Sequence, residues 1–130
     1  MSQHHTLNTL PRILSIAGSD TSGGAGIQAD TKTISACGAY ALTAVTALTA
    51  QDPDGVQAVW PVSTEQLRQQ ITCALRYEPT AIKLGMLGNA ALVQVVLDCL
   101  RTHPHISVVA DTIIRASSGA AWGSVHNAAQ

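Results

Sequence analysis

The 130-residue chain contains no phenylalanine, and aromatic residues make up only 3% of it. Charged residues are also scarce, at 12%, and they nearly cancel to a net charge of −1. Such a chain has neither the basic surface that binds nucleic acid nor the basic face that binds membranes. The longest uncharged stretch, residues 33–51, is rich in Thr, Ala, Gly and Ser, so it fits a buried strand better than a membrane span. We therefore expect a small molecule or another protein as the partner.

Cysteine occurs only three times. Cys37, Cys73 and Cys99 lie far apart, each on the apolar stripe of an expected helix, so we interpret them as small buried side chains and not as a disulfide or metal site. Residues 1–11 have no apolar signal core, and we expect them to form a disordered N-terminal segment. These features predict a cytoplasmic protein.

Short apolar runs alternate with helical patterns along the chain, which predicts an α/β fold with a mostly parallel sheet. The buried strands are expected at residues 13–17, 42–49, 81–84 and 106–110. Residues 56–62 alternate enough for an edge strand or a short flap. Helices are expected from Ala25 to Cys37, after the capping-box pair Ser63 and Gln66, and after Asn89.

The segment AGSDTSGGAGIQAD, residues 17–30, places four glycines and two acids between the first strand and the first helix. Polar residues or glycines also follow the other strands, in TAQD, KLGM and AD. Because the carboxyl ends of parallel strands meet at one edge of a sheet, this pattern predicts a single ligand site there. Its candidate residues are Gly18, Asp20, Asp30, Gln51, Lys83, Met86 and Asp111.

Most of these candidates also have a purely structural interpretation. Asp20 could cap free N–H groups of the glycine-rich turn, and Asp30 could simply stabilise the helix dipole. Gln51 could be a turn residue, although an amide at a strand end can donate to and accept from an aminopyrimidine in parallel. Lys83, within a buried strand, should contact a carboxylate or a ligand phosphate. Asp111 could pair with Lys83 or bind a metal.

Nucleotide-binding motifs give little support for other sites. The chain has no GxxxxGK[ST] phosphate loop. Residues 24–29 satisfy GxGxxA after a strand, as in dinucleotide-binding proteins. The second strand, however, ends in Gln51 before Asp52, where an acid should meet a ribose, which disfavours that interpretation.

The runs IAGSDTSGGAGIQADTKT, TAVTALTAQD, GVQAVWPV, AIKLGML and VVAD follow one another along the chain. In this order they resemble the hydroxymethylpyrimidine and phosphomethylpyrimidine kinases of thiamine biosynthesis, members of the ribokinase-like superfamily. The resemblance implies a ribokinase-like three-layer sandwich, with residues 12–119 as the N-terminal part of the kinase domain and residues 120–130 as an unassigned tail. It also implies phosphorylation of 4-amino-5-hydroxymethyl-2-methylpyrimidine, and then of its monophosphate, by ATP with Mg²⁺.

The same resemblance implies roles for individual residues. Gln51 would pair with the pyrimidine edge, Gly18 and Asp30 would complete the polar side, Met86 would pack on the ring, and Ile113 would line the pocket. The family usually has DPVM after the fourth strand, whereas this chain has the sequence DTII there, without the proline that shapes the turn.

Members of the family continue for about as long again, and that continuation carries the anion hole, the catalytic base and most of the ATP site. We therefore expect a truncated kinase that carries the pyrimidine-binding half, with a sheet incomplete at its C-terminal side and no appreciable turnover alone. One alternative is a non-catalytic pyrimidine-binding or assembly module. Another is a related kinase of the pyridoxal type. Because relatives are expected to dimerise through their sheets, a homodimer or a partner chain is also expected.

Overall fold

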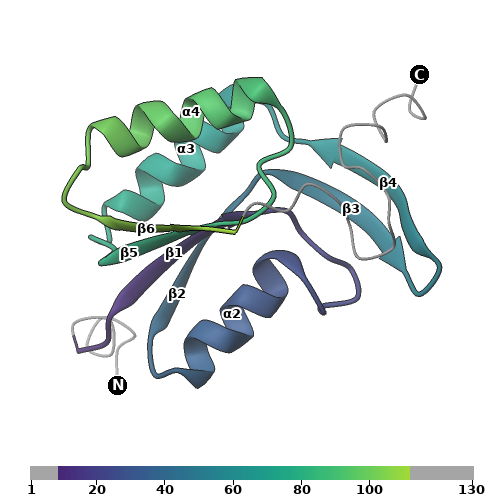
Figure 1. Ribbon diagram of the computed structural model, residues 1–130, viewed down its shortest axis with the longest axis horizontal. Helices are drawn as coiled ribbons and strands as arrows, with labels where there is room; N and C mark the ends of the chain where they lie inside the picture. The colour runs from purple at the N-terminus through teal and green to yellow at the C-terminus, as the bar shows by residue number, and fades with distance from the viewer. Residues whose placement is uncertain (1–8, 112–130) are drawn as a thin grey trace.

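A computed structural model of the chain describes residues 9–111. Its centre is a parallel sheet with the strand order β2-β1-β5-β6 (Figure 1). These strands are β1 (Arg12–Ala17), β2 (Tyr40–Val45), β5 (Ala81–Leu84) and β6 (Ser107–Ala110). The parallel sheet of the predicted α/β fold is therefore confirmed.

Helices lie on both faces of the sheet, as in a three-layer sandwich (Figure 1). On one face, α2 (Gly26–Ala36) packs against β1 and β2. On the other face lie α3 (Thr64–Leu75) and α4 (Ala90–Arg101), which pack against each other. Within residues 9–111, α2 is the only helix on the first of these faces, so no helix covers β5 and β6 there.

The hydrophobic core lies between the sheet and the α3–α4 layer. Side chains alternate between the two faces of a strand, so Leu14 and Ile16 of β1 point into this core. They form one cluster with Ile82 of β5, Leu67 of α3 and buried residues of α4. Burial of each such Leu or Ile contributes roughly 1.5–3 kcal/mol to the free energy of unfolding.

Both predicted helix caps on this layer are confirmed. The Ser63 hydroxyl accepts a hydrogen bond from the Gln66 N–H (3.1 Å), and the Gln66 side chain accepts one from the Ser63 N–H (2.8 Å). The Asn89 side chain accepts a hydrogen bond from the Leu92 N–H (3.0 Å) and caps α4. The expected first helix is also present, and it ends before Gly38, which adopts φ +80°.

The prediction of one buried strand at residues 42–49 is wrong, because the chain divides there at Thr46. The Thr46 N–H donates to the Ala17 carbonyl (2.9 Å), and the Thr46 carbonyl accepts from the Val62 N–H (2.9 Å). The next strand, β3 (Ala47–Asp52), leaves the sheet and pairs antiparallel with β4 (Gly55–Pro61). The flap expected at residues 56–62 is therefore one arm of a hairpin beside the sheet (Figure 1).

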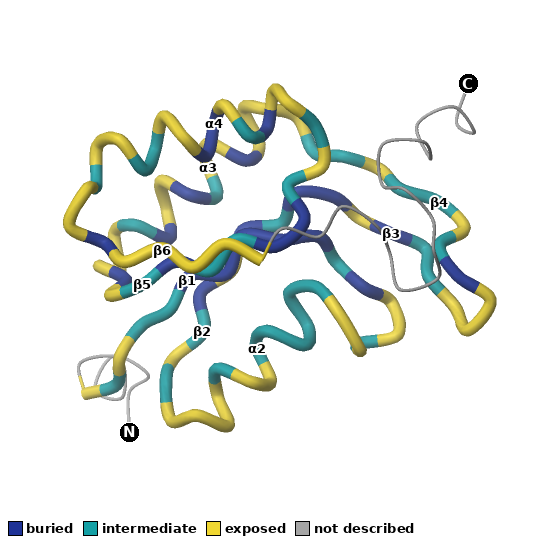
Figure 2. Tube along the Cα trace, in the orientation of Figure 1, coloured by how far each residue is buried: buried dark blue, intermediate teal, exposed yellow. Residues whose placement is uncertain are grey.

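The prediction of a buried last strand is also wrong. All four residues of β6 are exposed, and Val109 is 64% exposed (Figure 2). The physical reason is that β6 pairs only with β5 among the described strands, so its other edge is open. Among residues 9–111, β6 is therefore the edge strand on this side of the sheet.

Two of the three cysteines differ from the prediction as well. Cys37 and Cys73 are exposed, while Cys99 is partly buried. Burial raises the pKa of the Cys99 thiol. The buried face of α3 is formed by Leu67, Ile71 and Ala74, which leaves Cys73 outside it, and α2 has no fully buried residue.

Candidate functional site

The glycine-rich loop between β1 and α2 is organised around Asp20, whose side chain is almost fully buried. Its carboxylate accepts hydrogen bonds from the backbone N–H groups of Ser22 (2.9 Å) and Ala25 (2.7 Å) and from the Ser22 hydroxyl (2.8 Å). Burial alone raises the pKa of Asp20, but hydrogen bonds from Ser22, Ala25 and Gly24 outweigh it and lower the pKa below its usual value. The structural interpretation of Asp20, a cap for free N–H groups, is confirmed.

Hydrogen bonds also tie this loop to the hairpin. The Thr49 hydroxyl donates to the Ser19 carbonyl (2.6 Å), and the Thr21 hydroxyl donates to the Thr49 carbonyl (2.9 Å). The Gln51 N–H lies 3.4 Å from the Thr21 hydroxyl oxygen, which it contacts as a donor. The hairpin is therefore held against the loop at the carboxyl edge of the sheet.

Gln51 reaches this edge by a route that differs from the predicted one. The sequence placed it at the carboxyl end of a parallel strand, whereas it lies on β3, in the antiparallel hairpin. Gln51 therefore lies next to the glycine-rich loop because β2 ends and β3 leaves the parallel sheet at Thr46.

Because Gly18 has no side chain, Met86 and the start of α2 pack closely against it. A Cβ atom added to Gly18 would overlap the terminal methyl group of Met86. A Cβ atom added to Gly26, which adopts φ +59°, would overlap the Gly18 carbonyl oxygen. That oxygen accepts a hydrogen bond from the Ile27 N–H (2.9 Å). The start of α2, the end of β1 and Met86 therefore meet at one point.

An ion pair lies on the α2 face of the sheet. The Lys83 ammonium lies 3.0 Å from Oδ1 and 2.9 Å from Oδ2 of Asp30. The Ser15 hydroxyl donates to the same Oδ2 (2.6 Å). The prediction that Lys83 should contact a carboxylate is confirmed, and the carboxylate comes from α2. The sequence analysis offered Asp111 for that contact, whereas Asp111 is exposed after β6 and Asp30 takes the place beside Lys83.

The structure thus brings together most of the predicted residues at one sheet edge. Gly18 lies against Met86, Lys83 pairs with Asp30, and Gln51 contacts the loop that follows β1. Ile113 and the predicted tail at 120–130 lie outside the described residues.

Three polar residues that support this edge were missed by the sequence analysis. Ser15 binds Asp30, and the Thr46 hydroxyl donates to the Met86 carbonyl (2.7 Å). The Gln28 side chain accepts from the Asp20 N–H (2.8 Å) and donates to the Ser19 hydroxyl. A polar residue inside an apolar strand was a usable signal for Ser15. The roles of Thr46 and Gln28 depend on contacts that the sequence pattern does not encode.

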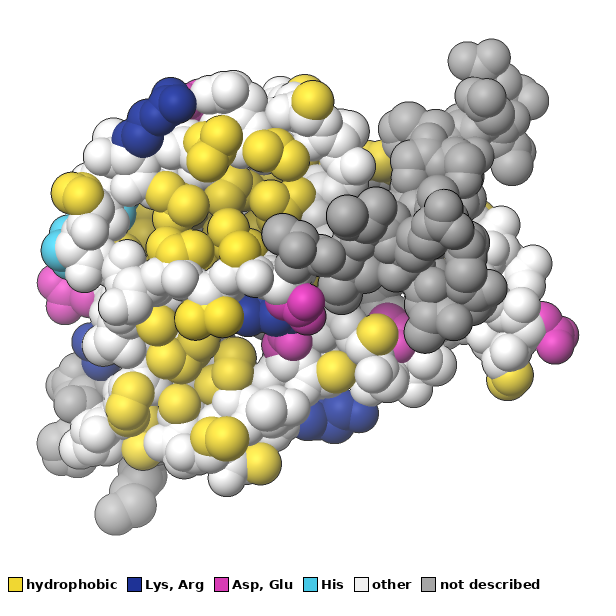
Figure 3. All heavy atoms as spheres, viewed as in Figure 1, with side chains coloured by type: hydrophobic (Ala, Val, Ile, Leu, Met, Phe, Trp, Pro, Cys, Tyr) yellow, Lys and Arg dark blue, Asp and Glu magenta, His cyan; other side chains and the backbone are white. Residues whose placement is uncertain are grey.

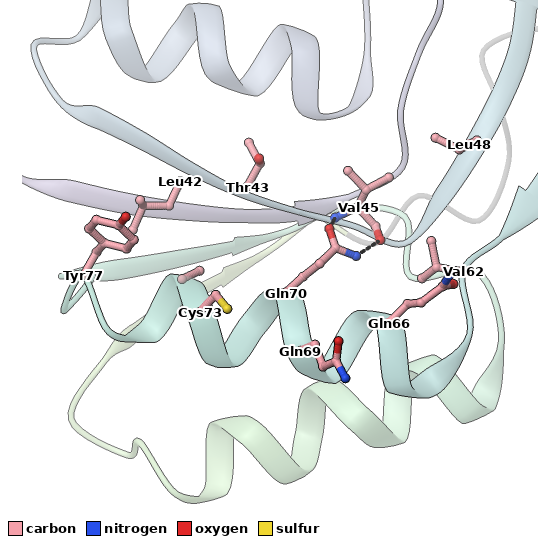
Figure 4. A pocket seen from close by; sticks show the side chains of 11 residues that line it. Leu42, Thr43, Val45, Leu48, Val62, Gln66, Gln69, Gln70, Cys73 and Tyr77 are labelled. Atoms are coloured by element: carbon pink, nitrogen blue, oxygen red, sulfur yellow. Dashed lines mark hydrogen bonds between the residues drawn. The ribbon is translucent and has the colours of Figure 1, made fainter.

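A separate groove of about 680 Å³ lies on the opposite side of the sheet, between β2, α3 and the start of the hairpin (Figure 4). Gln70 crosses it from α3, donating to the Val45 carbonyl (3.0 Å) and accepting from the Val45 N–H (2.9 Å). Its other walls are largely apolar, with Leu42, Leu48 and Tyr77. None of the predicted site residues within 9–111 lines this groove.

The described part of the chain offers no ready metal centre. Within residues 9–111, no group of three or more His, Cys, Asp or Glu side chains is placed to hold a metal ion. Over the same residues, no helix is long and apolar enough to cross a membrane.

Comparison with known proteins identifies the family of this chain. The family model described as phosphomethylpyrimidine kinase matches residues 20–129. The chain belongs to the phosphomethylpyrimidine kinase family. It is 42% identical over 110 residues to the hydroxymethylpyrimidine/phosphomethylpyrimidine kinase of Bacillus subtilis, with 84% of this chain and 41% of that protein covered. Other curated relatives are matched over between 14% and 43% of their length.

Solved structures agree with this assignment. The crystal structure of the phosphomethylpyrimidine kinase from Clostridium difficile 630 has a TM-score of 0.79 and 38% identity, covering 85% of this chain and 48% of that chain. The pyridoxal kinase from Staphylococcus aureus in complex with AMP-PCP and pyridoxal has a TM-score of 0.74 and 34% identity, covering 85% of this chain and 42% of that chain. The ribokinase-like fold of this kinase family is therefore confirmed, and the chain spans less than half the length of these relatives.

Proposed function

We propose that this chain carries the pyrimidine-binding part of a kinase that phosphorylates 4-amino-5-hydroxymethyl-2-methylpyrimidine, and then its monophosphate, with ATP and Mg²⁺ in the cytoplasm. The observation that carries the proposal is the meeting of Gly18, Met86 and the Asp30–Lys83 pair at the carboxyl edge of a parallel sheet. Ligands of open α/β sheets bind at that edge.

Each residue has a distinct task in this proposal. Met86 presents a pliable apolar wall to the ring, and Gly18 leaves room beside it. The Gln51 amide donates to and accepts from the pyrimidine edge, Asp30 accepts from it, and Ile113 adds an apolar contact.

Phosphoryl transfer needs further groups that position the nucleophile and stabilise charge on the moving phosphoryl group. Residues 9–111 supply no cluster of metal ligands, so we assign no step of the reaction to a magnesium ion held by them. Among the predicted site residues, Lys83 has the positive charge that could bind a phosphate group, but its ammonium already pairs with Asp30. Catalysis therefore requires parts of a complete kinase domain beyond the described residues.

Titration calorimetry with the hydroxymethylpyrimidine tests the binding site directly. Gln51→Ala should abolish measurable binding and leave the fold intact, because Gln51 is a partly exposed residue of the hairpin. Gln57→Ala on the partner strand β4 is the matched control, since Gln57 is exposed and its side chain donates to Asp52 (3.2 Å) at the hairpin turn. Unchanged affinity of Gln51→Ala would remove Gln51 from the site.

Turnover separates a kinase from a binding module. Mass-detected phosphorylation of the pyrimidine with Mg-ATP is measured for the chain and for Gln51→Ala purified identically, which controls for a contaminating host kinase. Turnover that is lost in the variant would establish an enzyme. Binding without turnover would support the non-catalytic pyrimidine-binding module.

A pyridoxal-type kinase is the second candidate, because the Staphylococcus aureus pyridoxal kinase that matches this chain was solved with pyridoxal. Competition calorimetry distinguishes the two. We expect the aminopyrimidine to displace pyridoxal, and the reverse order of affinities would favour the pyridoxal assignment.

A further inference from the structure

The Lys83–Asp30 pair differs from ordinary surface ion pairs of this chain. Arg68–Glu65 and Arg101–Asp98 each join exposed side chains three residues apart on one helix. Lys83 instead lies within a parallel strand and pairs with a helix residue 53 positions away. The side chains of Lys83 and Asp30 are only 26% and 17% exposed. A charge placed there is costly unless it is paired, so the arrangement points to a task beyond surface solubility.

The hydrogen bonds to Asp30 leave its two oxygens unequal. A carboxylate has about four acceptor sites, two on each oxygen, and no donor. Oδ2 accepts from the Ser15 hydroxyl (2.6 Å) and from the Lys83 ammonium (2.9 Å), which fills it. Oδ1 accepts only from Lys83 (3.0 Å) among the described residues. One acceptor site, on Oδ1, therefore has no donor among the described residues.

The surrounding backbone also fixes where the ammonium lies. A Cβ atom added to Gly85 would stand 3.2 Å from the Lys83 nitrogen and 2.8 Å from the Ala17 Cβ. The absence of a side chain at Gly85 thus lets the end of β1 and the Lys83 ammonium pack close to its backbone. Figure 3 shows basic and acidic side chains meeting between two apolar areas on this side of the molecule.

We propose that Lys83 is a positioning residue, which holds the Asp30 carboxylate so that one acceptor site on Oδ1 stays vacant. The site then selects heterocycles with an amino group, which can donate a hydrogen bond to Oδ1, over heterocycles with an oxo group, which cannot. The inference rests on the proposed function, in which Asp30 contacts the pyrimidine. A ligand carbonyl at the same position would place its oxygen against the carboxylate oxygen. Because neither oxygen carries a hydrogen, the hydrogen bond between ligand and Asp30 would be lost.

The test compares two probes by calorimetry, 4-amino-5-hydroxymethyl-2-methylpyrimidine and its 4-oxo analogue. For the unmodified chain we expect the amino probe to bind at least about tenfold more tightly, the range of one charge-assisted hydrogen bond. Lys83→Met should reduce this amino/oxo ratio about tenfold. Asp30→Asn should reduce it similarly, because the amide can donate to an oxo group. Adding Lys83→Met to Asp30→Asn should change the ratio no further.

Controls separate positioning from general damage. Lys32→Met removes the same charge from α2, where the exposed Lys32 side chain donates to the Gly23 carbonyl (2.6 Å), and should leave the ratio unchanged. If Lys83→Met does not fold, as judged by circular dichroism, Lys83→Gln takes its place with the same expected loss.

The possible outcomes are distinct. A Lys83 variant that weakens both probes equally, or leaves the ratio intact, overturns the positioning role while the proposed function stands. Failure of the unmodified chain to bind either probe would overturn the proposed function and this inference with it.

Discussion

Gly26 shows how a single backbone position shapes the candidate site. It adopts φ +59°, and a Cβ there would overlap the Gly18 carbonyl. Gly26→Ala should lower the free energy of unfolding by about 2 kcal/mol or more, since strain and overlap add. Gly38→Ala is the control, because Gly38 also has positive φ but no atom within 4 Å of an added Cβ. Urea denaturation of both variants measures the difference, and equal losses would contradict the close packing at Gly26.

Asp20 gives the stability of the chain a defined pH dependence. Its pKa is lowered in the folded state, so its contribution is fully present above the usual carboxyl value, near about 4, and is lost as the pH falls through the folded value. Asp20→Asn should lower the free energy of unfolding by about 1–3 kcal/mol at pH 7 and flatten its decrease on acidification. Urea midpoints at pH 7 and pH 2.5 check this. An undiminished slope in the variant would assign the acid sensitivity to another group.

Other residues of the site were predictable to different degrees. A lysine in an apolar strand needs a partner, so its pairing with a carboxylate followed from charge burial alone. The identity of that carboxylate did not follow, since the sequence analysis offered Asp111 and not Asp30. Only the packing of α2 on the sheet brings Asp30 to Lys83.

Among the helices and strands, α3 begins at a capping box that the sequence predicts. Ser63 and Gln66 exchange hydrogen bonds at 3.1 Å and 2.8 Å. Ser63→Ala should destabilise the fold by about 1 kcal/mol, because it leaves the Gln66 N–H without its cap, whereas Ser63→Asp should retain most of the stability. Thermal melting of the two variants is the measurement. A Ser63→Ala variant as stable as the parent would show that α3 depends on packing alone.

The division of residues 42–49 into β2 and β3 is the element that the sequence analysis missed. No glycine or proline marks Thr46, and the flanking residues favour a strand on both sides. The break is stabilised by bonds from Thr46 to Ala17, Val62 and Met86, which are distant in sequence. Tertiary contacts thus override a uniform local preference.

At the scale of the whole molecule, the edge of β6, which pairs only with β5 within residues 9–111, is the main liability for solubility. Val109 is 64% exposed, and Val108 of the same strand is also exposed. Figure 3 shows hydrophobic side chains gathered on this side of the molecule. An unpaired parallel edge with apolar side chains promotes association with other chains. Val109→Lys should therefore lower the weight-average mass in sedimentation velocity at a fixed protein concentration.

Gln57→Lys provides the charge-matched control for that experiment. It adds the same positive charge on the exposed hairpin, away from β6, and should leave the mass distribution as in the parent. Equal effects of the two substitutions would attribute the change to net charge and not to the sheet edge.

The sequence by itself determined the order and type of nearly all elements, the helix caps, and the residues that gather at the carboxyl edge of the sheet. These features depend on local spacing, propensity and the geometry of parallel strands, which a sequence carries directly. Only the tertiary structure decided that Gln51 lies on a hairpin, that Asp30 partners Lys83, and that β6 is exposed. Each of these features depends on which segments, distant in the sequence, come into contact. The burial of a strand depends on the elements that cover it as well as on its own hydrophobic pattern.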